Sequence, residues 1–136
     1  MCFVAVAACA STSPPQQASA PADMLGEFLD DYGVRYRVTP TEWTQLPRAR
    51  YHVLKWNVAG RYLIAQNDSG NASDPGLWTR IDWVDLPEMP PFRWGFCYSE
   101  YRAPSAAVAD TISVARRETP RTGCNGFPFS RMKRAQ

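Results

Sequence analysis

The stretch that decides the fold is GLWTRIDWVDLPEMPPFRWGFCYSEY, which runs from Gly76 to Tyr101 and holds three of the five tryptophans. It contains two runs in which apolar residues alternate with others, 77–83 and 92–98. Three prolines lie between them in residues 86–91, and a proline cannot donate to the hydrogen-bond ladder of a sheet. The stretch therefore predicts two antiparallel strands joined by a loop.

Side chains of a strand point alternately to its two faces, so each run has one apolar face. Those faces are expected to form the core of the domain. In the first run they carry Leu77, Thr79, Ile81 and Trp83, and in the second Phe92, Trp94, Phe96 and Tyr98.

Two further hairpins are predicted on either side of a connecting segment. Residues 25–38 alternate around an Asp and Gly turn at 30–33, and residues 50–67 form two runs rich in β-branched and aromatic residues. Residues 39–47 are expected to be connecting chain, with Trp43 plugging one end of the core. The sequence thus predicts antiparallel hairpins that form a small sheet or barrel.

One helix is predicted, from about Ala103 to Arg116, because Pro104 suits a first helical turn and apolar residues recur at helical spacing. Residues 119–132 are expected to turn back onto the core, with Phe127 and Phe129 packed against it, and residues 133–136 to fray. The chain is therefore mainly β with one helix, in a single domain of residues 23–132.

Charge is spread unevenly along the chain. The formal net charge is only +2, which does not indicate a nucleic-acid partner. From Arg93 onward, however, eight basic residues stand against three acidic ones. A solvated basic edge and a surface for anionic lipid or polysaccharide both agree with this excess.

The N-terminal 22 residues are typical of a leader and a tether. An apolar run ends in Val6-Ala7-Ala8-Cys9 and is followed by an uncharged, low-complexity segment up to Ala22. This tetrapeptide resembles the lipobox of bacterial lipoproteins, which implies export and a diacylated Cys9 that anchors the protein to the bacterial envelope. No Lys or Arg precedes the apolar run, so the alternatives are an ordinary signal peptide cleaved elsewhere and a chance apolar start.

Cysteine usage agrees with export. The domain itself keeps only Cys97 and Cys124, and one pair of cysteines in an exported domain is a natural disulfide. Such a bond would close a loop of about 28 residues and stabilise the fold by roughly 3–4 kcal/mol. Two unpaired thiols are the alternative.

Candidates for catalysis and metal binding are few. His52 is the single histidine, and it is expected on the same strand face as Leu54 and Trp56, in the core or a pocket wall. Asp82 is expected at the surface, paired with Arg80 or Arg93. The cysteines lack metal-site spacing, and the polar loop 67–76 does not fit a calcium-binding frame, so no cofactor is expected.

Segments including 64–68, 77–83, 96–98 and 123–130 resemble a group of uncharacterised secreted or lipid-anchored bacterial proteins, which implies a common domain and no assigned activity. The alternating strands are also similar in general form to calycin barrels. Two non-catalytic functions follow: an interaction or structural module that contacts envelope partners, or a barrel that binds an apolar or sugar ligand. A hydrolase is the third possibility. The candidate ligand-binding residues are His52, Trp56, Trp78, Trp83 and Trp94.

Overall fold

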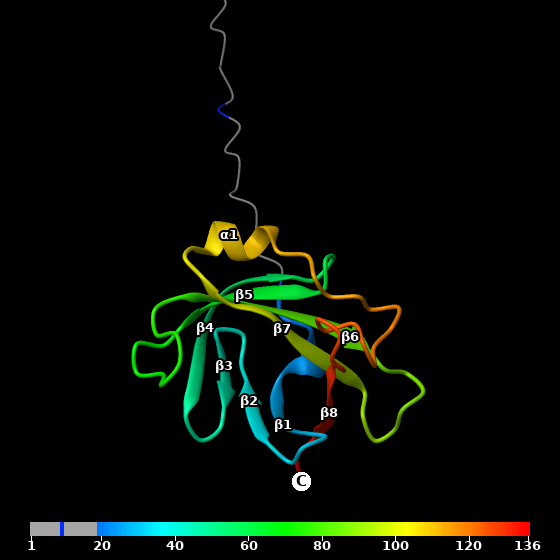
Figure 1. Ribbon diagram of the computed structural model, residues 1–136. Coiled ribbons are helices and arrows are strands. Elements are labelled where there is room, and N and C mark those ends of the chain that lie inside the picture. Colours follow the sequence, from blue (N-terminus) through cyan, green and yellow to red (C-terminus); the bar gives the residue numbers. More distant parts are fainter. Residues whose placement is uncertain (1–8, 10–18) are drawn as a thin grey trace, which may run out of the picture.

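The protein is an eight-stranded antiparallel barrel (Figure 1). A computed structural model describes Cys9 and residues 19–136. Each strand pairs with the next one along the chain, and β8 pairs with β1 to close the barrel. The strands are β1 (Gly26–Asp30), β2 (Arg35–Val38), β3 (Glu42–Gln45), β4 (Ala49–Asn57), β5 (Tyr62–Asn67), β6 (Trp78–Asp85), β7 (Trp94–Ala103) and β8 (Ser130–Arg134). The predicted mainly β fold is confirmed, and the sheet is closed.

The three predicted hairpins are present as β1–β2, β4–β5 and β6–β7. The segment 39–47, however, is not only connecting chain, because it contains β3, which pairs with β2 and with β4. Prolines at 40 and 47 flank this four-residue strand, so the sequence around it resembles a loop and has no long alternating pattern. Trp43 lies within it and is fully buried in the barrel interior.

The C-terminal residues close the barrel, which corrects the expectation that they fray. Lys133 and Arg134 belong to β8, which pairs with β1 on one side and β7 on the other. Met132 points inward and is fully buried. A strand as short as this is stabilised by pairing with residues far away in the sequence, and its own pattern is too short to predict it.

The predicted helix is much shorter than expected. Helix α1 covers only Ala106–Thr111, and Ser105 caps its first turn by accepting a hydrogen bond from the backbone N–H of Val108 at 3.2 Å. The helix ends at Thr111, and the backbone is already extended at Ile112. Ile112 and Val114 are β-branched and therefore poor helix formers. For this reason the helix does not extend to Arg116.

The segment 104–129, which joins β7 to β8, covers one side of the barrel wall. Helix α1 packs against an outer cluster that contains Ile64, Ala103 and Trp78. Further along, Cys124 forms a disulfide with Cys97 of β7, which confirms the predicted bond. Phe129 is buried against this outer wall, whereas Phe127, expected on the core, is 71% exposed. The inner side of the barrel wall thus carries one apolar cluster, and the outer side, under the segment 104–129, carries two others.

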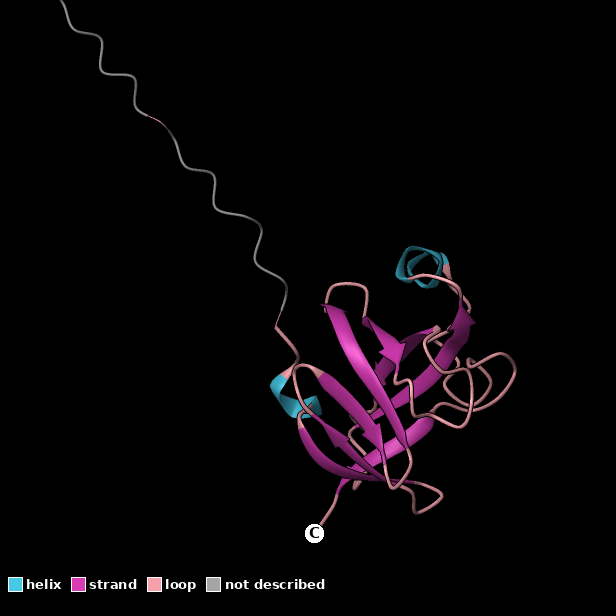
Figure 2. Ribbon diagram, turned by 90° about the vertical axis from the view of Figure 1, so that its left-hand side faces the viewer, coloured by secondary structure: helices cyan, strands magenta, loops and turns pink. Residues whose placement is uncertain are grey.

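The two ends of the barrel differ. The 3-10 helix η1 (Ala22–Met24) precedes β1, and Met24 is buried against the interior, so we call this the η1 end. Figure 2 shows η1 and α1 as two separate short helices far apart on the barrel. We call the opposite end the tyrosine end, for the residues described below. Among the described residues, no helix has the length and apolar character needed to cross a membrane.

The predicted leader and tether lie outside the described residues, apart from Cys9 and residues 19–22. Cys9 is exposed and is not part of a disulfide. The disulfide of the barrel is typical of proteins that mature outside the reducing cytosol.

Candidate functional site

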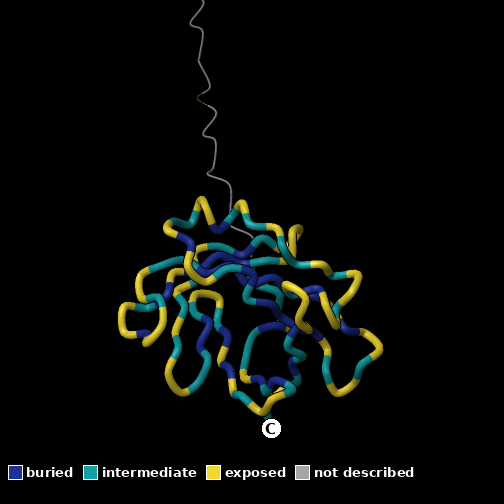
Figure 3. The backbone as a smooth tube through the Cα atoms, in the orientation of Figure 1, coloured by how far each residue is buried: buried dark blue, intermediate teal, exposed yellow. Residues whose placement is uncertain are grey.

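The barrel interior holds a cluster of the chain's own buried side chains. Figure 3 shows where buried residues occur along the strands. Trp43 lies at its centre with 0% exposure and contacts Phe96 edge-to-face, at 5.1 Å between ring centroids. Phe28, Leu63 and Met132 are also buried there. Interiors packed in this way leave little room for a second molecule. The half of the interior nearest η1 is therefore core.

The tyrosine end is the less tightly closed part of the interior. Tyr51, Val53 and Tyr98 face inward there, pack on the core and are only partly buried. Tyr36 lies beside them and is buried. The rings of Tyr51 and Tyr98 are 5.7 Å apart. An aromatic group with polar tips at a barrel mouth suits contact with a small ligand.

Hydrogen bonds hold these tyrosines in fixed positions. The Tyr98 hydroxyl donates to Gln45 Oε1 at 3.0 Å and accepts from Trp43 Nε1 at 3.1 Å. The Tyr36 hydroxyl donates to Asp30 Oδ2 at 3.0 Å. Burial raises the pKa of Tyr98 and of Tyr36, and the nearby Asp30 raises the pKa of Tyr36 further. Both hydroxyls therefore stay protonated and act as donors.

The five predicted ligand-binding residues do not lie together. Trp56 and Trp83 pack against each other inside the barrel, at 5.8 Å between ring centroids, and Trp94 lies in the same interior cluster. Trp78 lies on the outer wall, in the cluster under α1. The interior tryptophans are buried in the core and line neither of the clefts described below.

His52 lies on the outer wall, which corrects its expected place in the core or a pocket wall. Its side chain is 53% exposed, and Nε2 lies 2.7 Å from Asp68 Oδ1. The physical reason is a bulge at Leu54, because the register of β4 and β5 shifts between Val53 and Lys55. In a regular strand, residues 52 and 56 would point to the same face. The extra residue of the bulge reverses the alternation, so His52 points outward and Trp56 inward.

Asp82 is buried, which corrects its expected place at the surface. Its carboxylate is 1% exposed and accepts from Arg80 Nε at 2.9 Å, from Arg117 Nη2 at 2.7 Å and from the Ser99 hydroxyl. Arg117 also donates to the backbone oxygens of Gly60, Arg61 and Trp83. The cluster joins the segment 104–129 to β6 and is structural.

A second polar group fixes α1 to the same wall. Asp110 accepts from Lys55 Nζ and from the Tyr62 hydroxyl, both at 2.6 Å. The Lys55 ammonium, followed by the Tyr62 hydroxyl, lowers the pKa of the Asp110 carboxyl. The Arg80 guanidinium lies 3.7 Å from the centre of the Tyr62 ring. Sequence reasoning missed this group because its members come from four elements, β4, β5, β6 and α1.

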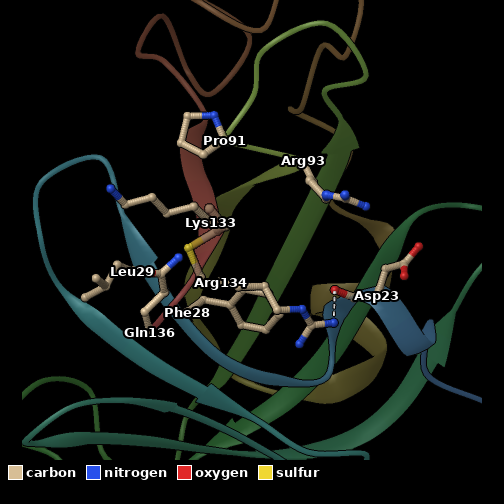
Figure 4. Close-up of a pocket in the computed structure, with 9 residues that line it drawn as sticks. Asp23, Phe28, Leu29, Pro91, Arg93, Lys133, Arg134 and Gln136 are labelled. Carbon is tan, nitrogen blue, oxygen red and sulfur yellow. Dashed lines mark hydrogen bonds between the residues drawn. The ribbon is translucent and has the colours of Figure 1, made fainter.

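Two clefts lie in the described part of the chain, one at the η1 end and one beside the segment 119–129. We call the first the basic cleft; its volume is about 700 Å³, and it lies at the η1 end where β1 and β8 meet (Figure 4). Its floor includes Phe28 and Met132. Its charged lining residues are Asp23, Arg93, Lys133 and Arg134.

We call the second the strap cleft; its volume is about 1120 Å³, and it lies beside the segment 119–129. Met89 and Phe129 contribute apolar surface, and Tyr32 on its rim is 78% exposed. Arg131 Nε donates to Asp31 Oδ2 at 3.0 Å. The other oxygen of that carboxylate, Oδ1, is buried without a hydrogen-bond partner in the described part of the chain.

Comparison with protein-family models, with curated proteins and with solved structures finds no match. The resemblance to uncharacterised secreted or lipid-anchored bacterial proteins therefore stays a prediction. Function has to be argued from the barrel itself.

Proposed function

We propose that this chain is an exported bacterial envelope protein, anchored by lipid on Cys9, whose barrel is a non-catalytic interaction module. One observation carries the proposal: the barrel interior is occupied by its own side chains, and the two clefts lie at its η1 end and beside the segment 119–129. The disulfide and the lipobox-like Val6-Ala7-Ala8-Cys9 support export. Partners are then bound outside the barrel.

The polar groups of the wall also favour this proposal over hydrolysis. Asp82 is fully engaged in binding two arginines and a serine, so it lacks a free lone pair for a general base. Among the described residues, the His52 side chain has one hydrogen-bond partner, Asp68, and it is not hydrogen-bonded to a hydroxyl or thiol that it could activate as a nucleophile.

Anchoring is tested with Cys9→Ser. The wild-type protein should fractionate with membranes and carry the mass of a diacylated cysteine, whereas the variant should leave the membrane fraction or accumulate unprocessed. Membrane fractionation that does not change in the variant, with no acyl mass on the wild type, would overturn the anchor.

The interaction surface is tested by photo-crosslinking in cells. A photoreactive phenylalanine analogue at Tyr32, on the rim of the strap cleft, should crosslink to envelope components. The same group at Val58, exposed in the β4–β5 loop at the η1 end, is the matched control and should give much less product. Equal crosslinking from the two positions would argue against a specific surface.

A small-ligand barrel of calycin type is the second candidate. It is favoured by one observation, the partly buried tyrosines that face inward at the tyrosine end. Native mass spectrometry of the exported protein should then show a co-purifying apolar or sugar ligand, and Tyr51→Ala should remove it. A ligand that is retained in Tyr51→Ala, or none in the wild type, would leave the interaction module as the better account.

A further inference from the structure

Positive charge in the basic cleft is not neutralised by the protein. Arg93, Lys133 and Arg134 line it, and within the described residues none of them forms an ion pair with a carboxylate. Three cations against the single acid Asp23 give the charged lining a net charge of +2. By contrast, Arg131, on the same strand, is paired with Asp31.

Arg134 is held in place before any ligand arrives. Its Nη1 donates to the backbone oxygen of Leu25 at 2.7 Å, and its Nη2 donates to the backbone oxygen of Asp23 at 3.4 Å. Its guanidinium carbon lies 5.0 Å from the centre of the Phe28 ring. Gly26 makes this approach possible: its φ is +123°, and a Cβ there would lie 2.7 Å from Arg134 Nη1. The remaining N–H groups of a fixed guanidinium bind an anion at reduced entropic cost.

Arg93 supplies a second guanidinium. Its side chain makes no hydrogen bond with the described residues, and it comes from the loop end that leads into β7. Figure 4 shows Arg93 and the end of Arg134 on the side of the cleft where Asp23 lies, and Lys133 extending to the other side. The two arginines therefore face the same region, in which Asp23 is the competing negative group.

We propose that the basic cleft binds a phosphate group, to which Arg93 and Arg134 donate hydrogen bonds while Lys133 adds long-range attraction. A phosphomonoester carries close to two negative charges at neutral pH, which matches the net charge of the lining, and guanidinium groups bind phosphate oxygens in pairs. The cleft volume of about 700 Å³ leaves space for the organic part of the ligand over Phe28 and Leu29.

This inference rests on the proposed function only in placing binding outside the packed interior, and it names a ligand class for the cleft at the η1 end. A phosphate could come from a soluble phosphate ester or from a lipid headgroup. The η1 end is where the chain coming from Cys9 enters the barrel, so an anchored protein would carry this cleft close to a membrane. The two sources are separated by the choice of probe.

The test uses the full chain with Cys9→Ser, which removes the acyl group, so the result does not depend on anchoring. Binding of glycerol 3-phosphate is measured by calorimetry, with glycerol as the phosphate-free control. Flotation is measured with phosphatidylglycerol and phosphatidylcholine vesicles. Arg93→Gln should weaken the phosphate-dependent binding about ten-fold, as expected for loss of one charge-assisted contact. Asp23→Asn should strengthen it, because it removes the competing carboxylate.

The matched control is the triple variant Arg48→Gln/Arg102→Gln/Arg116→Gln, which removes three exposed positive charges away from this cleft. It should leave binding within about two-fold of the parent, since exposed charges at a distance are screened by salt. Binding of glycerol 3-phosphate alone assigns a soluble ester, and flotation with phosphatidylglycerol alone assigns a headgroup. No phosphate-dependent binding in either arm, or equal loss in Arg93→Gln and the triple control, would overturn the proposal.

Discussion

Substitution of Asp82 by Asn is expected to destabilise the domain strongly. The carboxylate is 1% exposed and balances the guanidinium of Arg80, itself buried, and that of Arg117. Asparagine has nearly the same shape but no charge, so it leaves Arg80 buried without a counter-ion. Removing one partner of a buried ion pair costs about 3–5 kcal/mol. Because Arg117 is partly exposed and regains water, we expect a loss near the lower limit, about 3 kcal/mol.

Urea unfolding followed by tryptophan fluorescence measures this loss. With an m-value of about 1.5 kcal/mol/M, the midpoint of Asp82→Asn should fall by about 2 M. Asp85→Asn is the matched control, because Asp85 lies three residues away on the same strand but is exposed, with Arg61 at 3.6 Å. Its effect should stay below about 1 kcal/mol.

A double-mutant cycle with Arg117→Gln measures how much of the lost stability comes from the Asp82–Arg117 contact. If the Asp82–Arg117 contact is as strong as its geometry indicates, the two substitutions should be non-additive by about 1–3 kcal/mol. A loss for Asp82→Asn no larger than that for Asp85→Asn would refute the argument that the cluster holds the segment 104–129 against β6.

Three further predictions follow from the barrel. Cys97→Ala/Cys124→Ala should lower the free energy of unfolding by about 3–4 kcal/mol, because the bond closes a long loop, and thermal melting should match that of the reduced wild type. Met132→Ala should cost about 2–5 kcal/mol through a cavity in the interior, whereas melting that stays unchanged would mean that β8 does not close the barrel. Asp110→Asn should destabilise more at pH 7 than at pH 3. The folded-state pKa of Asp110 is lowered, so its charge contributes stability that is fully present above the unfolded pKa of about 3.9 and is lost as pH falls through the folded-state pKa; equal losses at both pH values in urea titrations would contradict this.

Local patterns in the sequence were enough for much of the fold. Alternation in residues 77–83 and 92–98 predicted β6 and β7, and it placed Ile81, Trp83 and Trp94 inside correctly. Turn residues at 30–33 predicted the first hairpin, and cysteine counting predicted the disulfide. Strands and turns depend on residues that are close together in the chain, and the two cysteines of the domain can form only one pair. Both kinds of feature can be seen directly in a sequence.

The candidate sites were much harder to predict. The bulge at Leu54 moved His52 to the outer wall, and one extra residue in a strand leaves no clear pattern in a single sequence. Nothing near Asp82 indicates that Arg117, 35 residues later, binds it. The basic cleft likewise joins residues of η1, β1, the β6–β7 loop and β8.

The sequence by itself determined six of the eight strands, the buried face of β6 and the Cys97–Cys124 disulfide, because alternation and turn chemistry act over a few residues. Only the tertiary structure decided that the sheet closes, that β3 and β8 exist, and that charges lie buried at Asp82 and exposed in the basic cleft. Short strands and charge clusters are stable only through partners that closure of the barrel brings together, and those pairings are absent from any local stretch of the chain.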